Sequence, residues 1–250
     1  MNIPHAWTGR DIRTFATLAR DLYANSNKIN EIRDELKQEL QKEIDIVGII
    51  EQFSNLFTYQ RGNIGYHRWG GLKYLLFEYE EYLHNNKFSQ DAQKIFINNY
   101  KQTAIEHIMP KTTTYWENEA NDFINLFNEE YKYFAKNIII NSLGNLTILK
   151  DSKNSSVSNN PWASTSTLIG KKERYSSGSF NEIQISQEKV WDKNTIFKRG
   201  KDLCKFLFKE KLGVKTDLTE ELLEKALFYS VDYYKIGFNI IDDNNIKKED

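Results

Sequence analysis

Apolar side chains recur at helical spacing along most of the chain, and the other positions are polar or charged. This pattern is typical of amphipathic helices that bury one face. In the first 100 residues it predicts helices over residues 11–24, 28–43, 46–57 and 72–83. The stretch 59–65 contains glycine and asparagine and is predicted to be a loop. We interpret residues 1–100 as a helical scaffold or a partner-docking region.

The pattern changes after Lys101. Residues 103–106 predict a short strand, which Pro110 stops because proline offers no backbone N–H to a neighbouring strand. An apolar, β-branched stretch predicts a second strand over residues 145–149. Between the two strands, apolar positions from Trp116 to Phe134 predict a strong helix.

The remainder of the chain again favours helices. Residues 151–158 fit either one helical turn or a loop, and Asn160-Pro161 predicts the start of a helix that runs towards Arg174. Further helices are predicted over residues 191–211 and 219–229, and residues 242–250 are predicted to be a frayed tail. The sequence therefore predicts a mostly α fold with a small two-stranded core, in which residues 101–215 form the central domain and residues 216–250 a C-terminal helix and tail.

Composition narrows the class of protein. A chain of 250 residues can bury a full core as one large domain or two small ones. Its single cysteine, Cys204, excludes a disulfide framework and four-thiolate zinc sites. The sequence contains no run of about 18 apolar residues and no apolar segment of the kind found in signal peptides. We therefore expect no membrane association and a cytoplasmic location.

Charge is distributed unevenly although the net charge is −1. Residues 31–60 carry seven acidic against three basic side chains, whereas residues 169–215 carry twelve basic against six acidic. A basic surface attracts phosphates, and the candidates for DNA-phosphate contacts are Lys171, Lys172, Arg174 and Arg199. The alternative is that these side chains are ordinary solvated helix charges, or that Arg199 is a structural ion-pair partner.

Four residues carry candidate chemistry for phosphodiester hydrolysis. A neutral histidine such as His107 can take a proton from water near neutral pH. The oxygens of Glu106 and Asn154 are hard ligands suited to Mg²⁺, and Asn145 has both donors and an acceptor with which to tie the histidine-bearing loop to the second strand. Neighbouring residues on a strand point to opposite faces. The first strand must therefore end at about Glu106 if Glu106 and His107 serve one phosphate.

Three motif pieces together resemble the HNH (ββα-metal) nuclease signature: Glu-His-Ile-Met-Pro at residues 106–110, Gly-Asn-Leu-Thr-Ile-Leu at residues 144–149, and Lys153-Asn154. The closest resemblance is to the C-terminal HNH-like domain of GmrSD-type, modification-dependent restriction endonucleases. It extends to Asn160-Pro161-Trp162, to Lys171-Lys172 and to the helix after Trp191. The resemblance implies a ββα-metal fold, His107 as the general base, Glu106 and Asn154 as metal ligands, and Asn145 as the orienting residue.

Two departures from the family pattern bear on the metal. The first carboxylate is a Glu where relatives often have Asp, and the third position is Asn rather than His. An all-oxygen pair favours Mg²⁺ or Mn²⁺ over Zn²⁺. GmrSD-type enzymes also have a nucleotide-dependent domain that senses modified DNA, and this sequence has no Gly-x-x-x-x-Gly-Lys phosphate loop. The resemblance therefore implies a separate NTPase or sensor protein as a candidate partner, and the other candidates are DNA and a second copy of the chain.

Two functions remain open at this point. The first is a metal-dependent DNA endonuclease that nicks strands in bacterial defence against phage or foreign DNA. The second is a catalytically inactive module of the same fold that binds DNA or a partner protein. The complete set of Glu106, His107, Asn145 and Asn154 favours the first, because a degenerate copy would be expected to lose one of them.

Overall fold

We analysed a computed structural model of the chain. It describes residues 65–86, 92–112, 114–127, 129, 132–157 and 159–228, together with five isolated positions before residue 50. The helices predicted over residues 11–24, 28–43 and 46–57, nearly all of the predicted loop 59–65, and the tail 242–250 lie outside the described residues.

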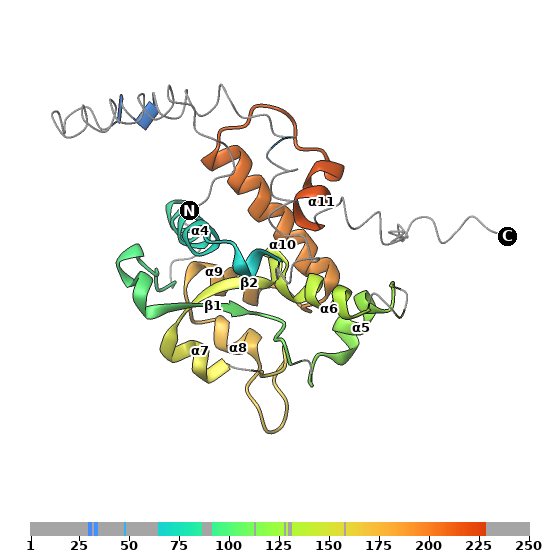
Figure 1. Ribbon diagram of the computed structural model, residues 1–250. Helices are drawn as coiled ribbons and strands as arrows, with labels where there is room; N and C mark the ends of the chain where they lie inside the picture. The colour runs from blue at the N-terminus through green and yellow to red at the C-terminus, as the bar shows by residue number, and fades with distance from the viewer. Residues whose placement is uncertain are drawn as a thin grey trace.

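A two-stranded antiparallel sheet lies at the centre of the described part of the chain (Figure 1). Strand β1 (Thr103–His107) pairs with β2 (Leu146–Lys150), with Ile105 opposite Ile148 and Glu106 opposite Thr147. Helices surround this sheet, which confirms the prediction of a mostly α fold with a small two-stranded core. β1 runs one residue further than predicted, because His107 still pairs with Leu146.

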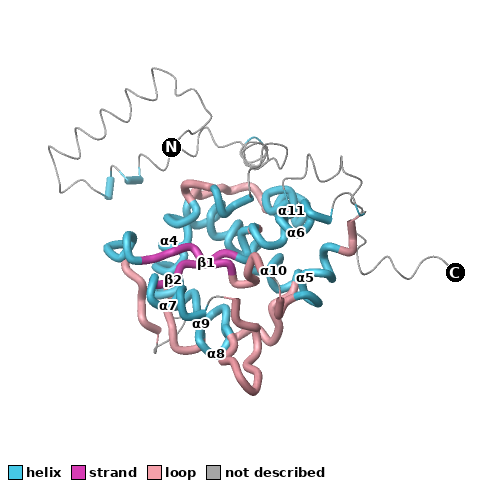
Figure 2. The backbone as a smooth tube through the Cα atoms, turned by 60° about the horizontal axis from the view of Figure 1, so that its bottom comes forward, coloured by secondary structure: helices cyan, strands magenta, loops and turns pink. Residues whose placement is uncertain are grey.

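The helices form two groups on opposite sides of the sheet (Figures 1 and 2). One side carries η3 (Gly65–Arg68), α4 (Leu72–Asn85) and α6 (Lys132–Asn141), and the other carries α7 (Asp151–Val157) and α8 (Lys171–Tyr175). The remaining elements are η4 (Ile97–Gln102), α5 (Glu117–Ile124), η6 (Leu143–Asn145), α9 (Phe180–Ser186), α10 (Lys193–Lys205), the π-helical η7 (Phe206–Lys211) and α11 (Glu220–Phe228). All of these except η4 contribute buried side chains to the core.

The long periodic helices agree with the sequence pattern, whereas the connections between them differ. The predicted helix over residues 72–83 is α4, and the one over residues 191–211 is α10 continued by η7. The single helix predicted from Trp116 to Phe134 is wrong, because α5 ends at Ile124 and α6 begins at Lys132. Ile138 to Asn141 then belong to α6, and the second strand starts only at Leu146.

The helix predicted from Asn160 towards Arg174 is also wrong. Residues 159–170 form a loop, and only Lys171–Tyr175 is helical. The loop is stable because side chains replace helical hydrogen bonds: Asn160 Nδ2 donates to the Ile169 carbonyl at 3.0 Å, and Ser164 Oγ accepts from Gly170 N at 2.9 Å. Helix α9 was not predicted. It starts at a capping box in which Ser179 and Glu182 exchange hydrogen bonds.

A close contact between α10 and η6 fixes the start of β2. A methyl group on Gly144 would lie 1.8 Å from the Ile196 carbonyl oxygen and 2.7 Å from Gly200 N, both of which are backbone atoms of α10. Arg199, on the same helix, donates through Nη1 to the carbonyls of Gly144 and Leu146 at 2.7 and 2.9 Å. The helix therefore sets the position of the turn that carries Asn145.

Gly144→Ala should lower the free energy of unfolding by at least about 1–3 kcal/mol, the usual cost of overpacking, because neither backbone segment can move aside easily. Gly70→Ala is the matched control, since within the described residues no atom outside Gly70 and its two chain neighbours lies within 4 Å of its added methyl group. Urea unfolding followed by circular dichroism measures both variants. Equal midpoints for the two would show that α10 and η6 are not packed as closely as described.

Candidate active site

The motif residues lie on a β1–β2–α7 unit. Helix α7 begins at Asp151, directly after the last residue of β2, and it packs against both strands. A helix that follows an antiparallel pair and crosses it brings its first turns beside β1. The arrangement agrees with the ββα core that the sequence resemblance implies.

Glu106 extends from β1 towards the side of α7 and α8, where it pairs with Lys171. Lys171 Nζ donates to Glu106 Oε1 at 2.5 Å and to the His107 carbonyl at 3.0 Å. The Lys171 side chain is fully buried, and 12% of the Glu106 side chain is exposed. Burial raises the pKa of Glu106 and lowers that of Lys171, and in each case the partner's charge opposes the shift. The two groups thus form a buried ion pair at the end of β1.

This pairing corrects the prediction for Lys171. A fully buried ammonium that contacts two protein oxygens does not contact a DNA phosphate, and the alternative of a solvated charge is equally wrong. Arg199 is likewise buried against backbone carbonyls, so it is structural rather than DNA-binding, although its partners are carbonyls and not an acid. Lys172 and Arg174 are only partly buried, and contact with DNA stays a prediction for these two.

His107 lies on the opposite face of the sheet. Its Nε2 is 2.9 Å from Asn141 Oδ1, and Asn141 Nδ2 donates to the Asn137 carbonyl at 3.0 Å. The amide orientation makes Oδ1 the acceptor, so Nε2 carries the proton and Nδ1 has the free lone pair. The ring also packs on His67, with ring centroids 4.5 Å apart. Burial lowers the pKa of His107 to about 3 despite the bond to Asn141, so the imidazole is neutral.

The structure therefore does not bring Glu106 and His107 to one face. β1 continues through His107, and regular alternation directs the carboxylate towards α8 and the imidazole towards η3 and α6. The expectation that the strand ends at about Glu106 is wrong. The backbone pairing of His107 with Leu146 and the hydrogen bond from Lys171 to the His107 carbonyl keep this residue in the strand.

Asn145 is buried and uses its whole amide. Oδ1 accepts from Met109 N at 2.8 Å and from Trp191 Nε1 at 3.0 Å. Nδ2 donates to the carbonyls of Met109 and Ile140 at 2.9 and 2.8 Å. The side chain thus ties the segment after β1, the end of α6 and the loop before α10 to the start of β2.

Two further polar residues of the β1–β2–α7 unit bear on the candidate site, Asn154 and Thr147. Asn154 lies partly exposed on α7. Thr147 is opposite Glu106 in the sheet, so its side chain lies on the same face, and its buried hydroxyl lacks a hydrogen-bond partner in the described part of the chain. Within that same part, no group of three or more His, Cys, Asp or Glu side chains could hold a metal. A metal here would need the amide oxygen of Asn154 and water.

Residues 50–206 match the family model for the C-terminal domain of GmrSD restriction endonucleases. The match covers more than half of the 250 residues. The chain belongs to this family. No curated protein and no solved structure matches it. In the described part of this GmrSD-type chain, no helix is long and apolar enough to cross a bilayer.

Sequence reasoning missed two residues of the candidate site in this GmrSD-type chain. Asn141, which orients His107, lies 34 residues further along the chain and belongs to no motif piece. The second residue is His67, whose ring packs on that of His107 and whose pKa is lowered by burial. No signal in a single sequence could have paired these residues, because each lies on a different element.

Asn145→Ala should destabilise the fold severely. It leaves two N–H donors and two carbonyls without a partner, and each buried unsatisfied group costs about 1–3 kcal/mol. The exposed Asn86, whose Nδ2 donates to the Tyr82 carbonyl, provides the matched control Asn86→Ala. Thermal unfolding compares the two variants. Similar melting temperatures would show that the buried amide of Asn145 does not stabilise the fold more than an exposed amide does.

Proposed function

We propose that this chain is a metal-dependent DNA endonuclease that nicks DNA in bacterial defence against foreign DNA. The family match supports a nuclease of the restriction type. The observation that carries the proposal is the β1–β2–α7 unit, in which the carboxylate of Glu106 lies on the face of the sheet that α7 covers. Asn154 lies on that helix.

Mg²⁺ or Mn²⁺ fits the donor set of Glu106 and Asn154. Lys171 donates to Oε1 of Glu106, and a carboxylate has about four lone-pair sites, so the group could bind a cation as well. The Thr147 hydroxyl, which has no hydrogen-bond partner among the described residues, is on the same face and suits a bound water. Two protein oxygens completed by waters are a common environment for Mg²⁺. When bound, such a cation neutralises charge on the phosphate oxygens and stabilises the leaving oxygen.

The protein's own groups would orient the reactants. His107 would take the proton of the attacking water at Nδ1, since Nε2 is engaged by Asn141. Lys171 would help to orient the carboxylate of Glu106, because its buried ammonium donates to Oε1. Asn145 would keep the segment after His107 in place through the Met109 backbone.

A specific observation favours the inactive alternative. Glu106 and His107 lie on opposite faces, and the ammonium of Lys171 already balances the charge of Glu106. The endonuclease proposal requires the end of β1 to rearrange with substrate, as catalytic contacts often tighten only in the reactive complex. An inactive module that binds DNA or a partner protein requires no such change.

A plasmid assay separates the two functions. We expect the wild-type chain to convert supercoiled plasmid to open circles with Mg²⁺ or Mn²⁺, and a chelator to abolish this conversion. His107→Ala should lose about 10²–10⁴-fold in rate, the usual contribution of a positioned general base, and should still bind DNA. Full activity of His107→Ala would eliminate the mechanism, and an inert wild-type chain that binds DNA would establish the inactive module.

The same assay reports on assembly. One metal and one base attack one strand per binding event, so a monomer should produce open circles before linear product. Linear product without an open-circular precursor would indicate an obligate homodimer. Because the net charge is −1, we expect modest affinity for DNA and direction by a separate NTPase or sensor protein. Adding a candidate partner to the plasmid assay tests this, and an unchanged rate counts against it.

Asn154→Ala should weaken Mn²⁺ binding in a calorimetric titration of the protein alone, because it removes one of the two proposed protein ligands. Ser152→Ala is the control, since Ser152 is an exposed side chain of the same helix. Equal Mn²⁺ affinity in the two variants would exclude Asn154 as a ligand.

A further inference from the structure

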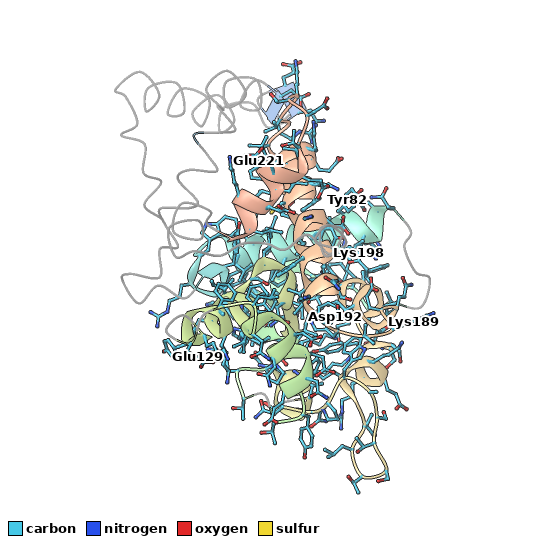
Figure 3. The ribbon with its side chains drawn as sticks, turned by 90° about the vertical axis from the view of Figure 1, so that its right-hand side faces the viewer. Tyr82, Glu129, Lys189, Asp192, Lys198 and Glu221 are labelled. Atoms are coloured by element: carbon cyan, nitrogen blue, oxygen red, sulfur yellow. The ribbon has the colours of Figure 1, made fainter. Side chains whose placement is uncertain are left out.

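A loop between α7 and α8 projects from the body of the protein. Figure 1 shows it as a yellow-orange loop below these two helices, and in Figure 3 it extends beyond the labelled Lys189 with its side chains outward. Its residues are Ala163-Ser164-Thr165-Ser166-Thr167-Leu168-Ile169-Gly170, which we call the finger. Residues 163–167 are exposed, and so is Ile169 at 50%.

The base of the finger is fixed. Lys171 N donates to the Pro161 carbonyl at 2.8 Å, and Lys172 N donates to the Trp162 carbonyl at 3.1 Å. Gly170 lies where the two ends of the finger approach each other, since a methyl group there would be 2.5 Å from the Trp162 carbonyl oxygen. The Trp162 ring packs against that of Trp191, with centroids 5.3 Å apart, and its Nε1 donates to the Lys189 carbonyl.

The tip is ordered by its own hydrogen bonds. Thr165 N donates to the Leu168 carbonyl at 2.8 Å, and Leu168 N donates to Thr165 Oγ1 at 3.0 Å. Ser164 Oγ accepts from Gly170 N and donates to Glu173 at 2.6 Å. A free loop loses conformational entropy when it is ordered by a ligand. The finger is ordered already, so less of that entropy remains to be lost on binding.

The finger is also rooted beside the candidate active site. The residue that follows it is Lys171, whose ammonium contacts Glu106 and the His107 carbonyl. The finger projects on the side of the sheet where Glu106 lies (Figures 1 and 2). The major groove of a DNA duplex alone is about 12 Å wide, so DNA that reaches Glu106 would extend beyond it on that side, towards the finger.

We propose that the finger lies against the sugar-phosphate backbone of DNA beside the cleaved phosphate. The proposal rests on the proposed function above. The finger carries four hydroxyl side chains and no charged residue. Ser and Thr hydroxyls and backbone N–H groups are regular donors to phosphate oxygens, and such contacts fix the register of a protein on DNA without reading sequence.

Charge substitutions at the tip test this proposal through the salt dependence of binding. Ser166→Lys should tighten DNA binding and steepen the log–log salt slope by about one unit, because one more phosphate is neutralised. Ser166→Glu should weaken binding. Asn121→Lys and Asn121→Glu are matched controls at an exposed position on α5, away from the finger, and should change the slope little.

Binding of a short labelled duplex, measured by fluorescence anisotropy at several salt concentrations without metal, provides the readout. The finger contact is supported if Ser166→Lys and Ser166→Glu change the DNA affinity and the salt slope in opposite directions, and by more than the Asn121 variants do. If the wild-type chain nicks DNA but the Ser166 variants bind DNA no differently from the Asn121 controls, the finger contact is overturned and the proposed function stays intact. A wild-type chain that neither binds nor nicks DNA would overturn both.

Discussion

The buried amide of Asn145 holds together segments that are far apart in the sequence. It bonds to the Met109 backbone, to the Ile140 carbonyl and to the indole of Trp191. Every donor and acceptor of the amide is used, and a fully satisfied polar group of this kind specifies one arrangement because any displacement leaves several partners unsatisfied. The end of β1 and the loop before α10 can therefore move only together.

A second buried interaction connects the finger to the sheet. An isolated buried ammonium is costly, and Lys171 is tolerated because a carboxylate and a carbonyl both accept from it. The removal of either charged partner would leave the other unpaired in the interior. Glu106 and Lys171 are thus interdependent, and the position of the finger depends on the group we propose as a metal ligand.

The sequence predicted the elements that bury a periodic apolar face. α4, α10 and both strands lie where apolar spacing placed them, within one or two residues. The loop at residues 159–170 was not predictable from Asn160-Pro161, because this pair is compatible with a helix start and only the later contacts of Ser164 and Asn160 decide against it. Likewise, nothing in a run of basic residues distinguishes the buried Lys171 from the partly exposed Lys172.

The motif identified the candidate residues but not their arrangement, because alternation along a strand is a property of the folded backbone. Glu106 and His107 are adjacent in sequence and point to opposite faces. Lys171 bonds to the Glu106 side chain and to the His107 carbonyl at once, so it fixes the backbone at the point where the two side chains diverge. A rearrangement that brings His107 to the face of Glu106 must break the bond from Lys171 to this carbonyl and the pairing of His107 with Leu146. A cation bound at Glu106 would repel the ammonium of Lys171 and weaken its contact with the carboxylate. If a cation binds at Glu106, its binding and the conformation at the end of β1 would therefore be coupled through Lys171, which contacts both the carboxylate and the His107 carbonyl.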